Sequence, residues 1–210
     1  MASKTEKKSV IRKDIIDSAR IYSSNLAGKN FLYVYDKEYF EVLFPIDHFL
    51  HLTGVESKLS AKNFYKNAKK GKITNNQFYF SNRHPYANAK KKLPYLKRLP
   101  ELTNEMVCLL KDMKTLSVVY KLSLTNLEFT LGLTENINSR GKKVNAFFLP
   151  MSLRVEDSSV ERSINGEIID FIFSKDACVT KYDSLIVRDR NKNIPESVYH
   201  LIDEKFYKEE

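Results

Sequence analysis

The feature that most constrains the fold of this chain is a change in the period of its apolar residues near the middle. Within residues 5–26, apolar side chains recur three or four positions apart, the spacing of one helix face: Val10, Ile11, Ile15, Ala19 and Tyr22. The second half carries five runs rich in branched and aromatic residues, typical of strands: 116–124, 127–133, 146–153, 167–174 and 182–189. Helices followed by strands predict an α+β fold, with N-terminal helices packed on a mostly antiparallel β-sheet.

Shorter elements are predicted around these two regions. They are a hairpin of strands 31–35 and 39–44, helices over 46–52 and 61–70, a strand at 77–80, a helical region over 87–113 and a last helix over 195–206. Pro94 and Pro100 divide the region 87–113 into two pieces, because proline interrupts helical hydrogen bonding. The predicted organisation is an N-terminal helix (1–28), a single α+β domain (29–190) with a basic helical insert (58–113), and a C-terminal helix (191–210).

The two cysteines and the apolar runs indicate the compartment. Cys108 and Cys178 are far apart and form no zinc-binding spacing, so we expect free thiols in a reducing environment. No apolar run reaches the roughly 20 residues of a membrane span, and the first ten residues lack the apolar core of a signal peptide. We therefore expect a cytoplasmic protein without membrane contact.

Positive charge is concentrated in one segment. The net charge is +9, and residues 58–98 hold twelve Lys or Arg and no Asp or Glu, with seven aromatic residues between them. Clustered cations neutralise phosphates, and aromatic rings stack on bases, so the segment predicts nucleic-acid binding. The candidate contacts are Lys62, Lys66, Lys69, Lys70, Lys90, Lys92, Lys97 and Arg98. Two other interpretations remain, an acidic protein partner and a solvated helix face. A membrane surface is the weakest, because the segment lacks a large apolar face.

The chain has no motif that holds a metal ion or a nucleotide cofactor. There is no glycine-rich phosphate loop, no HExxH and no carboxylate cluster of the two-metal kind. We therefore expect no cofactor and no metal. An enzyme of this composition that cleaves a phosphodiester would act on RNA, whose 2′-hydroxyl is a nucleophile within the substrate. Such a reaction needs a general acid, a general base and cations near the phosphate.

The stretch "HFLHLTG" holds two of the four histidines, His48 and His51, within the predicted helix 46–52. Residues three apart are neighbours on a helix surface, so both imidazoles lie close together. Thr53 and Gly54 end this helix in a tight turn, which can present a side chain into a cleft. The alternative is structural, with one histidine in the core and the other exposed to solvent.

Two later stretches are further candidates. Pro150-Met151-Ser152 interrupts an apolar strand and places the Ser152 hydroxyl where the strand leaves the sheet. Lys181 and Tyr182 open the last strand, where alternation puts them on opposite faces unless a bulge intervenes. The alternative is that Pro150 and Lys181 protect exposed strand edges against pairing.

Several stretches taken together resemble a known family. They are "FPIDHFLHLTGV", "LSAKNFYKNAKKGKI", a leucine-rich helix with lysines, "FFLPMSL" and "TKYDSLIV". They resemble the fourth of the phage-associated families named for barnase, EndoU, colicin and RelE-like nucleases, found in phage and mobile-element proteins. The resemblance covers about residues 30–190. It implies N-terminal helices on an antiparallel sheet and a metal-independent ribonuclease.

The resemblance also implies site residues. His51 and Thr53 match its HLTG element, Ser152 its PxS element, and Lys181 with Tyr182 its KY element. Either Lys92 or Lys97 matches a helix lysine, and His48 has no counterpart.

Two functions follow as hypotheses. The first is an endoribonuclease that binds RNA through its basic segment and cleaves it by general acid–base catalysis. The second is a non-catalytic anti-defence protein that binds RNA or a ribonucleoprotein. The protein partners that fit are an acidic antitoxin covering the basic segment and a host defence complex.

Overall fold

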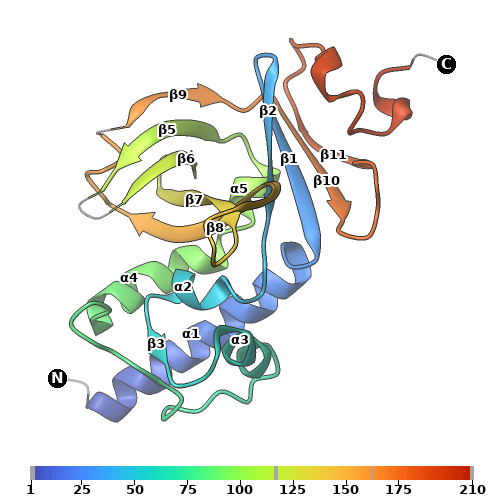
Figure 1. Cartoon of the computed structure of the whole chain (residues 1–210). Helices are drawn as coiled ribbons and strands as arrows, with labels where there is room; N and C mark the ends of the chain where they lie inside the picture. Colours follow the sequence, from blue (N-terminus) through green and yellow to red (C-terminus); the bar gives the residue numbers. More distant parts are fainter. Residues whose placement is uncertain (1–2, 116–117, 162, 209–210) are drawn as a thin grey trace.

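The computed structural model describes residues 3–115, 118–161 and 163–208. Helices gather at one end of the molecule, and a strongly curved sheet forms the other end (Figure 1). The predicted α+β fold is confirmed, since the first helix is followed by a large and mostly antiparallel sheet. No helix among the described residues is long and apolar enough to cross a membrane.

The first helix, α1 (Lys4–Asn25), begins at a capping box. The Ser3 side chain accepts from the Glu6 backbone N–H, and the Glu6 carboxylate accepts from the Ser3 N–H, which satisfies two donors at the helix start. One face of the helix is fully buried, and it packs against helices α3 (Ala61–Lys69) and α4 (Tyr86–Lys97). The helix predicted over 5–26 is therefore confirmed.

Nine strands of the described residues form one sheet. They are β1 (Lys29–Tyr35), β2 (Glu38–Leu43), β5 (Cys108–Lys114), β6 (Val119–Thr125), β7 (Phe129–Ile137), β8 (Lys143–Val155), β9 (Ile164–Ile168), β10 (Phe171–Asp176) and β11 (Ser184–Arg188). Their order is β11-β10-β1-β2-β8-β7-β6-β5-β9, and only β2 and β8 pair in parallel. Two residues separate β9, which pairs with β5, from β10, which pairs with β1. The segment 164–176 therefore joins both sides of the sheet and curves it back on itself.

The remaining elements connect the first hairpin to the sheet. They are α2 (Phe49–Thr53), β3 (Glu56–Ser57), α3, β4 (Phe78–Tyr79), α4 and α5 (Glu101–Asn104). Strands β3 and β4 pair only with each other among the described residues and form a small ribbon beside the helices.

Two apolar cores lie on opposite faces of β1. Phe31 and Tyr33 point into the first core with α1, α2, α3, α4 and the concave side of the sheet. Leu32 and Val34 point into the second core, which the C-terminal segment covers with Val198 and other apolar residues. The alternation follows from the two-residue period of a strand.

Part of the predicted helical region 87–113 is wrong. Helix α4 ends at Lys97 and α5 at Asn104, but residues 108–114 form strand β5. Met106, Leu109 and Leu110 continue the spacing of three or four residues that is typical of a helix face. Strand β5 has partners on both sides, β6 and β9, and these backbone hydrogen bonds stabilise the extended form.

Two other predictions also need correction. The C-terminal helix of residues 191–210 is instead two short 3-10 helices, η1 (Glu196–Val198) and η2 (Glu204–Phe206), because Pro195 and the second core determine the path of this segment. The strand predicted over 167–174 is divided at the corner between β9 and β10. Residues 116 and 117 of the strand predicted over 116–124, and the terminal residues 1, 2, 209 and 210, lie outside the described residues.

Candidate active site

Helix α2 presents its histidines outward because its apolar side is anchored in the first core. Phe49 and Leu52 are fully buried. The Phe49 ring packs edge-on against Tyr22 and Tyr65, with ring centroids 5.4 Å apart in both pairs. These contacts fix a helix of one and a half turns that would be unstable alone. His48, at its N-terminal cap, and His51 are left on the outer side.

The Gly54 turn joins α2 to α4 at close range. Gly54 has φ +73°, a left-handed conformation that favours glycine. A Cβ at this position would lie 3.2 Å from Cδ of Lys92 and 3.4 Å from the backbone of Ala89. The glycine of the HLTG element therefore serves both the turn and the contact between the two helices.

Thr53 is fully buried beside this turn. Its Oγ1 donates to the Leu50 carbonyl at 2.7 Å and accepts from the Val55 N–H at 3.4 Å. These contacts close the end of α2. The hydroxyl predicted as a catalytic group thus lies inside the protein and holds the turn that displays His51.

Three of the four histidines lie near one another. The His48 and His51 rings have centroids 6.1 Å apart, and His84 is close enough to influence the protonation of His51. His48 Nδ1 lies 2.8 Å from the Pro150 carbonyl oxygen on β8, and it must be the donor because a carbonyl carries no hydrogen. We call His48, His51 and His84 the histidine cluster.

The histidine cluster changes the acidity of His51. Partial removal from water lowers the pKa of His51 below its usual value, and the neighbouring His48 and His84 lower it further. Asp47 acts in the opposite direction. With a pKa below 6.5 the imidazole is mainly neutral at pH 7. His51 is also exposed at the surface, so it is open to a ligand.

His84 reaches the histidine cluster through a hydrogen-bonded loop. The Ser81 hydroxyl donates to the Glu56 carboxylate and accepts from the His84 N–H at 3.1 Å. Glu56 lies on β3, two residues after the Gly54 turn. The loop before α4 is therefore tied to the same segment that carries His51.

Lys92 is the helix lysine that faces the site. Its stem lies against Gly54, and burial together with the nearby Arg154 lowers its pKa to about 8, with Asp157 opposing the change. Lys97 instead points to α1, where its Nζ pairs with Asp14 at 2.8 Å. Of the two lysines that the sequence left open, Lys92 therefore lies against the Gly54 turn, and Lys97 is directed to α1.

A cleft of about 240 Å³ separates α4 from β8. Its lining residues are Asn88, Lys91, Lys92, Leu153, Arg154, Val155, Glu156 and Asp157. Arg154 Nη1 pairs with Asp157 at 3.1 Å, and its guanidinium lies over the Tyr120 ring at 5.8 Å. The Arg154 Nε is buried and has no hydrogen-bond partner among the described residues. A guanidinium with an unused donor suits an anionic ligand.

Ser152 lies between Pro150 and Arg154 on the same strand. Opposite β7, Leu133 pairs with Pro150 and Gly132 with Ser152, so Met151 is the extra residue of a β-bulge. The strand thus continues through the PMS element instead of leaving the sheet there, as the sequence suggested. No hydrogen bond engages the Ser152 hydroxyl within the described part of the chain, and Ser152 is two residues from the carbonyl that holds His48.

Lys181 and Tyr182 lie in a different environment. Tyr182 is fully buried in the second core, and its hydroxyl donates to Glu41 Oε1 at 2.7 Å. Burial and this carboxylate raise the pKa of Tyr182 well above its usual value. The Lys181 Nζ donates to the backbone carbonyl of His200. Since α2 packs into the first core, the structure does not bring these two residues to the histidine cluster.

Replacing Tyr182 by phenylalanine tests which role the hydroxyl has. We expect Tyr182→Phe to lower the free energy of unfolding by about 1–3 kcal/mol, because Glu41 loses a hydrogen-bond donor. Any rate of RNA cleavage should change by less than about threefold. The measurements are denaturant unfolding and cleavage kinetics on the same preparation. A hundredfold loss of rate with unchanged stability would restore the catalytic assignment from the sequence.

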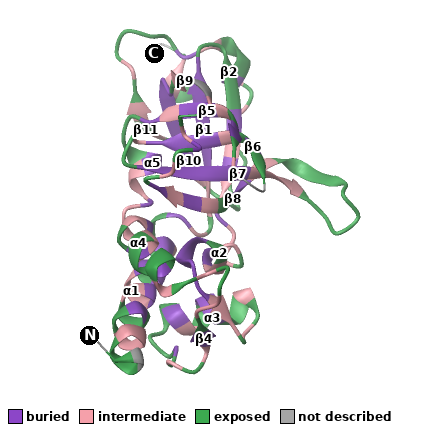
Figure 2. Ribbon diagram, turned by 90° about the vertical axis from the view of Figure 1, so that its left-hand side faces the viewer, coloured by how far each residue is buried: buried purple, intermediate pink, exposed green. Residues whose placement is uncertain are grey.

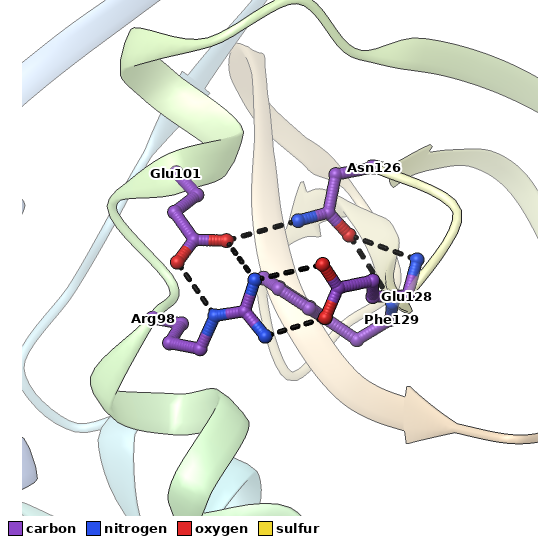
Figure 3. A network of polar contacts seen from close by, with 5 residues as sticks. All are labelled: Arg98, Glu101, Asn126, Glu128 and Phe129. Carbon is purple, nitrogen blue, oxygen red and sulfur yellow. Dashed lines mark hydrogen bonds and ion pairs between the residues drawn. The ribbon is translucent and has the colours of Figure 1, made fainter.

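The predicted nucleic-acid contacts divide into two groups. Lys62, Lys66, Lys69 and Lys70 of α3 and its end, with Lys90 of α4, are exposed and form no ion pair among the described residues. Lys97 is paired with Asp14, as above. The Arg98 guanidinium donates to the carboxylates of both Glu101 and Glu128 (Figure 3). The Asn126 side chain also donates to Glu101 and so belongs to the same network. The ion pairs that the described part of this segment forms with carboxylates from elsewhere in the chain thus lie along α4 and at its end.

Three residues were missed from the sequence: His84 of the histidine cluster, and Arg154 and Asp157 of the cleft. Each stands alone in a polar loop or an alternating strand, where its residue type is ordinary. The only local sign of a role for His84 was its position, just after a strand-like run inside the basic segment. Arg154 and Asp157 become notable only because β8 lies opposite α4. Among the described residues, no group of three or more His, Cys, Asp or Glu side chains is placed to hold a metal ion.

Comparison with protein families places the chain in a nuclease group. A family model described as phage-Barnase-EndoU-ColicinE5/D-RelE like nuclease4 matches residues 14–191. No match was found among curated proteins or among solved structures. The matched region includes the histidine cluster, Lys92 and Arg154. The chain therefore belongs to the phage-associated barnase–EndoU–colicin–RelE-like nuclease family 4.

Proposed function

We propose that this protein is an endoribonuclease whose active site is the surface formed by α2, α4 and the β8 strand. The observation that carries the proposal is that three candidate residues from distant parts of the sequence lie on adjoining elements. His51, Lys92 and Arg154 are far apart in sequence, yet the Gly54 turn and the cleft bring their segments together. Helix α2, which carries His51, packs against α4 and β8, which carry Lys92 and Arg154. An imidazole with a lowered pKa and cations on adjoining elements fit phosphodiester cleavage.

The proposed reaction uses groups of the chain and of the substrate. Neutral His51 accepts the proton of the RNA 2′-hydroxyl, and the 2′-oxygen attacks the adjacent phosphorus. The bond from phosphorus to the 5′-oxygen breaks, and His84 supplies the proton that this oxygen needs. Lys92 and Arg154 stabilise the additional negative charge on the phosphate oxygens. Ser152 orients the scissile group.

The exposed lysines of α3 would bind the substrate backbone. Lys62, Lys66 and Lys69 recur at three or four positions and so lie along one face of the helix, opposite the buried Phe64 and Ala68. Phe64 also contacts Phe49 of α2, with ring centroids 6.3 Å apart. The cationic face thus belongs to a helix that packs directly on the helix with His51. Lys181 and Tyr182 have structural roles in this proposal.

The proposal is tested by the ends of the products. Purified protein incubated with labelled RNA in EDTA should give fragments with 2′,3′-cyclic phosphate and 5′-hydroxyl ends. Cleavage that is abolished by EDTA and restored by a divalent cation would contradict the metal-independent mechanism. Fragments with 5′-phosphate ends would contradict the role of the 2′-hydroxyl.

A second candidate is a binding protein without catalysis, favoured by the exposed lysines on α3, which need no chemistry to bind RNA. It predicts tight binding whose logarithm falls steeply with the logarithm of salt concentration, and no cleavage under any condition. An acidic antitoxin or a host defence complex would then cover the same lysines. Cleavage of RNA by the wild-type protein would exclude this alternative.

A further inference from the structure

A hairpin arm extends from the sheet next to the candidate active site. Strand β7 pairs with β6 only up to Leu133, and β8 pairs with β2 at Phe148. Among the described residues, strands β7 and β8 pair only with each other over this hairpin, with Thr134 opposite Leu149, Glu135 opposite Phe148 and Ile137 opposite Lys143. We call residues 134–147 the β7–β8 arm, which projects well beyond the rest of the molecule (Figure 2).

The β7–β8 arm adds nothing to either apolar core. Every residue from 137 to 146 is exposed, and Ile137 and Val144 are 53% and 58% exposed. An arm of this length costs conformational entropy without burying apolar surface in return. It therefore suits contact with another molecule.

The tip of the arm holds cations on an ordered turn. The Asn138 Oδ1 accepts from the N–H groups of Arg140 and Lys142 at 2.9 and 3.1 Å, and Gly141 adopts φ +74°. Lys143 lies 3.6 Å from Glu135, but Arg140 and Lys142 have no ion pair among the described residues. Two unpaired cations on a preformed turn are suited to bind phosphates.

The base of the arm lies at the candidate active site. Strand β8 continues from the arm into Pro150, whose carbonyl holds His48, and then into Arg154 of the cleft. Helix α2 contacts β8 on this side and α3 on the other. A strand bound along α3 and crossing His51 would therefore continue toward the arm.

From these observations we propose that the β7–β8 arm is a clamp for long RNA, contacting phosphates several nucleotides from the cleaved bond. This inference rests on the proposed function. The eight residue-to-residue steps from Leu149 to Gly141 span about 26 Å at ~3.3 Å each, which matches about eight stacked nucleotides. Short substrates would not reach the tip, so the preferred substrate is an extended RNA.

The test compares two double variants of equal charge. Arg140→Ala with Lys142→Ala removes the cations of the tip. Lys37→Ala with Arg190→Ala removes one exposed lysine and one exposed arginine near the β1–β2 turn. All proteins are assayed on an RNA of about 30 nucleotides and on a dinucleotide. Binding is measured on an uncleavable 2′-O-methyl RNA at several salt concentrations.

The arm variant should raise KM for the long RNA about tenfold and leave dinucleotide cleavage unchanged. Its slope of log affinity against log salt should fall by about 1 to 2, as expected for two lost phosphate contacts. The control variant should resemble the wild type. Equal behaviour of the two variants would overturn the clamp, as would an equal loss on both substrates by the arm variant.

Failure of the clamp and failure of the proposed function give different results. If the wild type cleaves neither substrate, catalysis is disproved, and the salt slopes on uncleavable RNA still decide whether the arm binds. If the wild type cleaves both and the arm variant matches it throughout, catalysis stands and the clamp is wrong. A protein partner on the arm, instead of RNA, would give that second result.

Discussion

Replacing His51 by alanine is expected to lower kcat for RNA cleavage by about 10²–10⁴-fold, the usual contribution of a general acid or base. KM for long RNA should change little, because the exposed lysines that bind the backbone remain. The assay is single-turnover cleavage of labelled RNA with the enzyme in excess. It separates the chemical step from product release.

His200→Ala is the matched control for His51→Ala. His200 is the only histidine outside the histidine cluster, and its ring lies near Tyr39, 6.1 Å between centroids, beside the C-terminal segment. It should retain the wild-type rate. Equal losses in the two variants would indicate a general effect of histidine removal. An unchanged rate in His51→Ala would disprove the catalytic assignment.

The pH dependence of kcat gives a second test of His51. As general base, His51 must be neutral, and its folded-state pKa is lowered below the usual value of 6.5. The rate should therefore rise with pH through that lowered pKa, which places the acid limb below 6.5. An acid limb centred above 6.5 would contradict the assignment.

Replacing Lys92 by alanine is expected to lower kcat by about 10²-fold, because a cation close to the phosphate is lost. The more specific result is at alkaline pH. The pKa of Lys92 is lowered to about 8, so the wild-type rate should fall as pH rises through that value. Lys92→Arg keeps the charge at all these pH values, and it should retain activity while moving the alkaline limb upward. A limb near pH 8 that persists in Lys92→Arg would contradict this role.

The charge of Lys92, which should support cleavage, should lower the stability of the fold. A charged amine with a lowered pKa is disfavoured in the folded state, so it destabilises the protein below pH 8, and the cost disappears as pH rises from 8 toward the usual 10.5. Lys92→Met should therefore raise the free energy of unfolding at pH 7 by about 1–3 kcal/mol. Denaturant unfolding at pH 7 and 10 measures both parts. A destabilised Lys92→Met would show that the charge supports the fold.

Local pattern was sufficient where neighbours in sequence determine the structure. The first hairpin and the Gly54 turn both depend on residues a few positions apart. Strand β5 was mistaken for helix because its partners β6 and β9 come later in the chain. Leucine spacing alone does not distinguish the two forms.

The candidate site was found in part for the same reason. His51 stood out because the HLTG turn is local, whereas Tyr182 looked comparable until its hydroxyl was placed against Glu41 in the second core. Arg98 looked free because its own segment has no carboxylates. Glu128 approaches it only through the β6–β7 turn.

Composition and local spacing were sufficient to predict the α+β class and the cationic character of residues 58–98. The folded structure was needed to show which cations remain unpaired, that Lys92 and not Lys97 faces the cleft, and that Arg154 lies opposite it. The physical reason is that ion pairing, burial and pKa depend on distances in space. Those distances are set when the curved sheet brings β8 against α2 and α4.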